Sequence, residues 1–158
     1  MTDFLASISD LGADPDIEAL LGRVCELTGM GFAAVAHVSE TRWIALQVED
    51  RVAFGLKPGD ELEIKKTICD EIRASGHTIA IDNTDADPDW WNHPVPILYG
   101  FHSYVSLPIV IDGSFFGTLC ALDDAPRVRP LQGDIAELEA MARDIARLLA
   151  RKLGVGQG

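Results

Sequence analysis

Two adjacent tryptophans and a nearby histidine are the side chains of this sequence best suited to binding a ligand. Trp90, Trp91 and His93 lie in the proline- and aspartate-rich run DNTDADPDWWNHPVPIL, residues 82–98. Indole rings in a loop are stabilised by burial, so a loop that covers a sheet can use them as the roof of a pocket. Two plainer interpretations stay open, in which Trp90 is a core residue under a long loop and His93 is a surface residue. In the sharper interpretation, His93 binds haem iron or donates a hydrogen bond to an anion.

The positions of the cysteines in the sequence indicate reduced, partly buried thiols rather than a redox or zinc site. Cys25, Cys69 and Cys120 are far apart in sequence, and each lies in an apolar segment. Such spacing is typical of a reducing compartment and lacks the CxxC pairs of zinc sites. Asp70 follows Cys69 and disfavours a thiolate there. We expect Cys120 to be a pocket wall, with a redox role as the alternative.

The acidic residues between 82 and 89 do not have the spacing of a calcium loop, so no metal site is predicted. We expect these aspartates to form turns and helix caps. The candidate pocket combines aromatic, hydroxyl, thiol and acidic side chains from the irregular segment and the strands around it. Its members are Trp43, Cys69, Asp82, Trp90, Trp91, His93, Tyr99, Tyr104, Ser106, Phe116, Thr118 and Cys120.

These residues must be positioned by a β-hairpin at the centre of the chain. Residues 103–111 and 115–122 alternate as strands, and Asp112-Gly113 between them is typical of a two-residue type I′ turn. Gly117 leaves room for another backbone to approach. The uniformly apolar face carries Val105, Leu107, Ile109 and Ile111. We assign the more polar set to the cavity side: Tyr104, Ser106, Phe116, Thr118 and Cys120.

The remaining pattern predicts an α+β fold in a single domain. We expect helices over 4–11 and from Asp14-Pro15 to Gly29, strands at 31–38, 43–49 and 78–81, and a middle helix opened by Thr67. The helices at 1–29 and 131–153 would cover one face of a five- or six-stranded antiparallel sheet within 30–125. The middle helix and the irregular segment would cover the other face, with a ligand cavity beneath them.

The last helix carries an apolar heptad seam, which predicts a homodimer contact. The seam consists of Leu131, Ile135, Leu138, Ala142, Ile145 and Leu149. In the alternative interpretation this helix only covers its own sheet.

Charge and hydropathy exclude two classes of partner. The net charge of −12 argues against nucleic-acid binding, which needs a basic surface. No apolar run is long enough to span a membrane, and the sequence has no secretory leader. We therefore expect a cytoplasmic protein.

Four segments resemble the GAF domain family, the small-molecule sensing modules of signalling proteins. They are ICDEI (68–72), DNTDADPDW (82–90), YGFHSYVSLPI (99–109) and GSFFGTLCALD (113–123). The resemblance implies a PAS-like sandwich, a ligand cavity and dimerisation through helices from both ends of the domain. It is strongest to GAF domains of sensor histidine kinases and cyclic-dinucleotide enzymes. We therefore expect either a stand-alone sensor or a sensor that acts on an output kinase or cyclase domain outside this chain.

The resemblance also excludes several classes of ligand, although it does not identify the ligand. Bilin-binding relatives attach the chromophore through a cysteine about eight residues before the late-strand phenylalanine, and His93 stands there. Covalent bilin is therefore not expected. The signatures of cyclic-nucleotide binding and of methionine sulfoxide reduction are also missing. We expect a non-enzymatic sensor of a small molecule, chromophore or redox state. The alternatives are a dimerisation module with a vestigial pocket and, third, a thiol-dependent reductase.

Overall fold

The computed structural model describes residues 14–39, 42–62, 76–87, 90, 100–127 and 130–153. The described strands form one six-stranded sheet in the order β3-β2-β1-β6-β5-β4, and every neighbouring pair is antiparallel. This confirms the predicted α+β fold. The strands are β1 (Phe32–Val38), β2 (Trp43–Asp50), β3 (Glu61–Leu62), β4 (Ile79–Ile81), β5 (Ser103–Ile111) and β6 (Ser114–Asp123).

Helix α2 (Pro15–Thr28) begins and ends where the sequence predicts. The Asp14 side chain accepts a hydrogen bond from the Asp16 amide at 2.8 Å, and Pro15 occupies the first turn, where it costs no hydrogen bond. Gly29 ends the helix with a φ of 74°, a conformation that favours glycine. The cap and the terminator are thus local signals, readable without tertiary structure.

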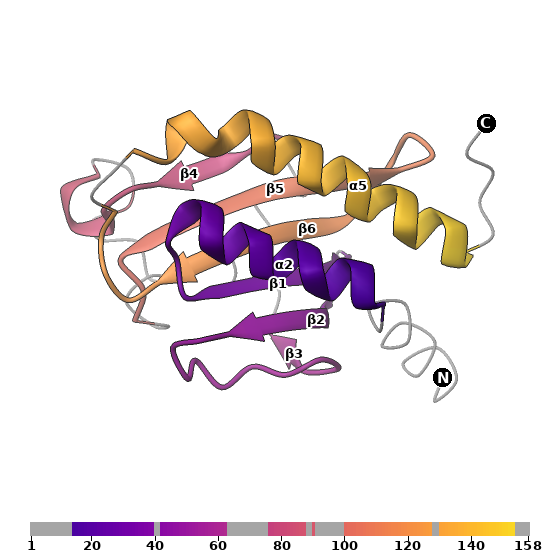
Figure 1. Cartoon of the computed structure of the whole chain (residues 1–158), viewed down its shortest axis with the longest axis horizontal. Helices are drawn as coiled ribbons and strands as arrows, with labels where there is room; N and C mark the ends of the chain where they lie inside the picture. Colours follow the sequence, from indigo (N-terminus) through magenta and orange to yellow (C-terminus); the bar gives the residue numbers. More distant parts are fainter. Residues whose placement is uncertain are drawn as a thin grey trace.

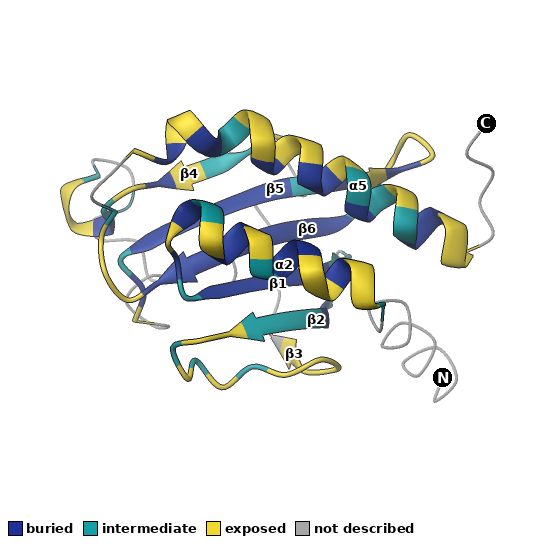
Figure 2. Ribbon diagram, viewed as in Figure 1, coloured by how far each residue is buried: buried dark blue, intermediate teal, exposed yellow. Residues whose placement is uncertain are grey.

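The helix at the carboxyl end starts with a 3₁₀ turn, η3 (Leu131–Asp134), and continues as α5 (Ile135–Leu153). Helices α2 and α5 lie across the same face of the sheet (Figure 1). Buried and exposed residues alternate along both helices (Figure 2), and the buried ones pack in the core with residues of the sheet. The start of α2 lies beside the end of α5, where Lys152 Nζ is 3.8 Å from Asp14 Oδ2. The predicted placement of both terminal helices on one face is therefore correct.

The heptad seam packs inside its own chain, which corrects its assignment as a dimer contact. Its members Leu131, Leu138, Ala142, Ile145 and Leu149 are at most 5% exposed and belong to the core cluster beneath α2 and α5. Ile135 is partly buried against the same cluster. The spacing marks the stripe that covers the sheet, because a 3.5-residue seam and a broad core-facing stripe share the same positions. A homodimer would need other residues.

The central hairpin has the predicted turn, with φ of 53° at Asp112 and 77° at Gly113. Gly117 lets the carbonyl of Ala36 approach so closely that an added Cβ would collide with it. A bulge between Ile109 and Val110 shifts the register of β5 against β6. Because an extra residue inverts the alternation, Phe116 packs toward the helix-side cluster. Its assignment to the cavity side was wrong.

Several predicted elements lie outside the described residues. They are the first helix at 4–11, the middle helix opened by Thr67, and most of the irregular segment 82–98. Within that segment the structure describes a short 3₁₀ turn, η2 (Thr84–Ala86), capped by the Asn83 side chain, and Trp90.

Candidate functional site

The sheet face opposite α2 and α5 has a centre of small side chains. Cross-strand pairing places Ala45, Ala36, Thr118 and Pro108 in one row across β2, β1, β6 and β5. The neighbouring row holds Ala34, Cys120 and Ser106. We call the six small members of these rows the small-residue floor: Ala34, Ala36, Ala45, Ser106, Thr118 and Cys120. All six are buried. Short side chains leave space above a sheet that a ligand or another segment can fill.

Aromatic rings border this floor. Phe32 and Phe54 have ring centroids 5.0 Å apart, and Phe101 stacks on Tyr104 at 5.2 Å. Trp90 is half-buried against the same cluster. Small side chains ringed by large flat ones are typical of ligand sites, because the rings supply contact area and the small residues supply volume.

Trp43, at the start of β2, contributes an unusual polar group to this face. The residue is only 3% exposed and packs with Ala36, Val38 and Ala45. Its indole nitrogen Nε1 is buried and has no hydrogen-bond partner among the described residues. Leaving a buried donor unsatisfied costs roughly 1–3 kcal/mol. Such a donor is available to an acceptor atom of a bound molecule.

The structure places half of the predicted pocket residues on one face of the sheet. Trp43, Trp90, Tyr104, Ser106, Thr118 and Cys120 all belong to the face opposite the helices. Cys69, Trp91, His93 and Tyr99 lie outside the described residues. Phe116 lies on the helix side, as given above.

Asp82 serves the framework of the described structure rather than the candidate pocket, which corrects its assignment. Its Oδ1 accepts a hydrogen bond from the Leu131 amide at 2.8 Å, and its carbonyl accepts one from the Arg127 amide at 2.7 Å. The Leu131 amide opens η3, where no helical partner exists. Asp82 therefore holds the start of the last helix against the end of β4.

The two described thiols lie on opposite faces of the sheet. Cys25 belongs to the helix-side core, where burial raises the pKa of its thiol to about 11. At neutral pH this thiol is protonated and a poor nucleophile. Cys120 is a buried member of the small-residue floor. Its role as a pocket wall stays a prediction.

The sequence interpretation missed the loop after β2. Val52, Phe54 and Leu56 pack onto the face opposite the helices. The Asp50 carboxylate shapes this loop by accepting hydrogen bonds from the amides of Val52, Phe54 and Gly55 at 2.9–3.2 Å. Partial burial acts to raise the pKa of Asp50, but the hydrogen bonds from these amides outweigh it. The net result is a pKa below the ordinary value of an aspartate. Apolar residues at every second position of the loop were the available signal.

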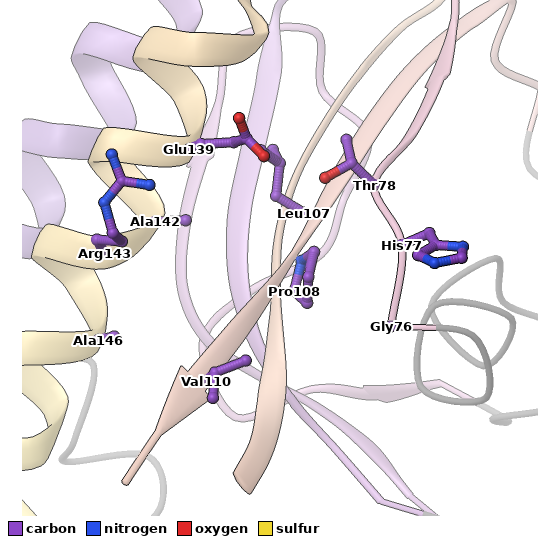
Figure 3. Close-up of a pocket in the computed structure, with 10 residues that line it drawn as sticks. All are labelled: Gly76, His77, Thr78, Leu107, Pro108, Val110, Glu139, Ala142, Arg143 and Ala146. Carbon is purple, nitrogen blue, oxygen red and sulfur yellow. The ribbon is translucent and has the colours of Figure 1, made fainter. Parts of the chain in front are cut away.

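A depression that we call the edge groove has a volume of about 410 Å³ and lies between α5 and the outer edge of β5. Strand β4 pairs with β5 only from Tyr104 to Ser106, so the edge beyond has no strand partner among the described residues. Pro108 explains this, because a proline nitrogen cannot donate to a neighbouring strand and so favours an open edge. The groove is lined by Gly76, His77, Thr78, Leu107, Pro108, Val110, Glu139, Ala142, Arg143 and Ala146 (Figure 3).

None of the His, Cys, Asp and Glu side chains of the described residues form a group of three or more that could hold a metal ion. None of the helices that these residues form is long and apolar enough to cross a bilayer.

Most of the chain matches a known domain family. The family model of the GAF domain matches residues 17–153. The chain belongs to the GAF domain family. A search of curated proteins found no significant match.

Solved structures share this GAF fold at low sequence identity. The GAF domain of an Acinetobacter phosphoenolpyruvate-protein phosphotransferase matches at a TM-score of 0.68 with 12% identity, covering 99% of this chain and 96% of that one. The GAF domain of PixJ from Thermosynechococcus elongatus, in its blue-light absorbing form, gives 0.67 and 16% over 92% and 88%. A type II free methionine-R-sulfoxide reductase from Thermoplasma acidophilum gives 0.67 and 12% over 91% and 96%. These likenesses concern the fold.

Proposed function

We propose that this GAF domain is a non-enzymatic sensor that binds a small molecule, without covalent attachment, on the small-residue floor. Trp43 carries the proposal, because its buried indole N–H, beside a surface of small side chains, has no hydrogen-bond partner among the described residues. The ligand would present an acceptor oxygen or nitrogen to Nε1 and an apolar or flat part to the rim of rings. Neither a covalent bilin nor a protein-held metal is needed for this arrangement.

A change in the packing of the small-residue floor would be transmitted to α5 through the strands. Thr118 and Cys120 alternate on β6 with Leu119 and Ala121, which pack in the core beneath the helices. A ligand that favours one of two packings of the floor shifts the helix-side packing through the same strand. The output, a kinase or cyclase domain, and a homodimer formed through the outer faces of α2 and α5 are further parts of this proposal. A cytoplasmic location remains a prediction from the sequence.

Substituting Trp43→Phe tests the proposal, because it removes the N–H and keeps an aromatic ring. The low-mass fraction of the host lysate is the first probe, and thermal unfolding and calorimetry are the readouts. We expect a ligand that stabilises the wild-type chain and binds Trp43→Phe at least about tenfold more weakly, the loss typical of one buried hydrogen bond. Trp90→Phe, which alters the rim and leaves Nε1 of Trp43 in place, is the matched control.

Other outcomes lead to the alternatives. A chain that no low-mass fraction stabilises would favour the dimerisation module with a filled pocket. Thiol-dependent turnover of a small oxidised substrate, lost in Cys69→Ser or Cys120→Ser, would favour the reductase.

A further inference from the structure

We propose that the edge groove between α5 and β5 is a second ligand site, which takes a small zwitterion with an apolar side chain, that is, an apolar α-amino acid. This site goes beyond the ligand proposed for the small-residue floor. Its volume of about 410 Å³ falls within the roughly 300–1,000 Å³ of small-molecule sites. Its polar side chains and its apolar base are arranged separately, and each predicts one part of the ligand.

The charged wall comes from α5, where Glu139 and Arg143 stand one turn apart. Residues four apart on a helix readily form an ion pair, worth about 0.2–0.5 kcal/mol. Neither side chain makes an ion pair with the other, or with any other residue in the described part of the chain. Both charges are therefore available. A ligand with an ammonium and a carboxylate satisfies both, and the guanidinium can bind the carboxylate through two parallel hydrogen bonds.

The opposite wall adds a hydroxyl. Figure 3 shows the Glu139 carboxylate pointing from α5 across the groove toward Thr78, whose hydroxyl oxygen faces the groove. The His77 ring turns away from the helix, so this residue contributes mainly backbone. An ammonium group between Glu139 and Thr78 would find two oxygen acceptors. A ligand with only negative charge would meet the Glu139 carboxylate and be disfavoured.

The base of the groove is apolar. Pro108 and Val110 come from β5, and Ala142 and Ala146 come from α5. Val110 is 49% exposed, unusual for a valine inside a strand. An aliphatic side chain lying on this base would cover it and gain roughly 25 cal/mol for each Å² of apolar surface buried. The alanines matter because larger residues at these positions would fill the groove.

Methyl NMR of the whole chain with three probes tests the inference. L-Leucine carries both charges, 4-methylpentanoate lacks the ammonium, and 3-methylbutylamine lacks the carboxylate. We expect L-leucine to shift the methyl signals of Thr78, Ala142 and Ala146 and to bind at least about tenfold more tightly than either half-molecule. The signals of Ala34 and Ala36, on the small-residue floor, should stay in place.

Variants separate the groove from general effects of charge. Glu139→Gln and Arg143→Gln should each weaken L-leucine about tenfold, and Ala146→Leu should abolish its binding by filling the groove. Glu137→Gln and Arg151→Gln make the same charge changes on α5 outside the groove and should leave binding unchanged. Equal binding of the three probes, no shift at about 10 mM L-leucine, or shifts confined to Ala34 and Ala36 would each overturn the inference.

Discussion

The two faces of the sheet are built from different kinds of side chain. Beneath α2 and α5, branched aliphatic residues such as Val35, Leu119 and Ile145 interlock into one continuous core. On the opposite face, alanines, a serine, a threonine and a cysteine occupy the centre, and rings lie around them. Dense aliphatic packing stabilises a fold, whereas small central residues give up part of that stabilisation and leave volume. The contrast assigns most of the stability to the helix face and is the reason that the proposed ligand site lies on the other face.

The largest expected effect is on the helix face. Leu138, in α5, is fully buried in the core beneath the helices. Leu138→Ala should lower the free energy of unfolding by about 2–5 kcal/mol, because it removes buried methyl groups and leaves a cavity. Urea unfolding followed by circular dichroism measures this. Glu137→Ala, the exposed neighbour, should change it by less than about 0.5 kcal/mol. A loss below about 1 kcal/mol for Leu138→Ala would mean that this face is not the main source of stability.

An intermediate effect comes from two consecutive alanines of β1 that face opposite ways. Ala33 belongs to the helix-side core and Ala34 to the small-residue floor, and both are fully buried. Ala33→Leu should destabilise the chain by about 1–3 kcal/mol through overpacking. On the proposed ligand site, Ala34→Leu should cost less than about 1 kcal/mol, because its side chain would enter that site, and it should block ligand binding. Equal costs in the same urea experiment would show that both faces are equally filled.

The smallest effect concerns His37, which lies at the edge of the helix face. Burial lowers its pKa below the ordinary value of 6.5, although the 2.8 Å hydrogen bond to the Phe116 carbonyl opposes this. Below about pH 6.5 the unfolded chain binds the proton more readily than the folded one, so stability should fall as the pH falls through and below this value. His37→Gln should weaken that dependence in unfolding curves taken from pH 7.5 down to 5. If the pH dependence of stability is the same in His37→Gln as in the wild type, other titratable groups cause it.

Local patterns in the sequence predicted most of the fold. Asp14-Pro15, Gly29 and Asp112-Gly113 set a cap, a terminator and a turn through their own backbone preferences. Alternation predicted the faces of Tyr104 and Cys120. It failed at Phe116, because the bulge that inverts the alternation depends on pairing between strands.

The candidate site was only partly predictable, for a related reason. Asp82 carries a carboxylate and lies in the irregular segment, so the sequence favours a ligand-binding role. Only the position of the Leu131 amide, 49 residues later, reveals its role in the framework. The heptad spacing of α5 fits a dimer seam and a core-facing stripe equally well, so the sheet had to be placed first. The edge groove arises from the juxtaposition of Pro108 with α5. No sequence pattern specifies that distance.

The indole N–H of Trp43 gives the most direct test of the account. Its proton signal in a ¹H–¹⁵N spectrum can be assigned because it disappears in Trp43→Phe. We predict an upfield position typical of an unbonded indole in the ligand-free chain, and a clear downfield shift when a stabilising low-mass fraction is added. A signal already downfield without ligand, or one that stays in place while the fraction stabilises the chain, would contradict a ligand site on this face with Trp43 as its donor.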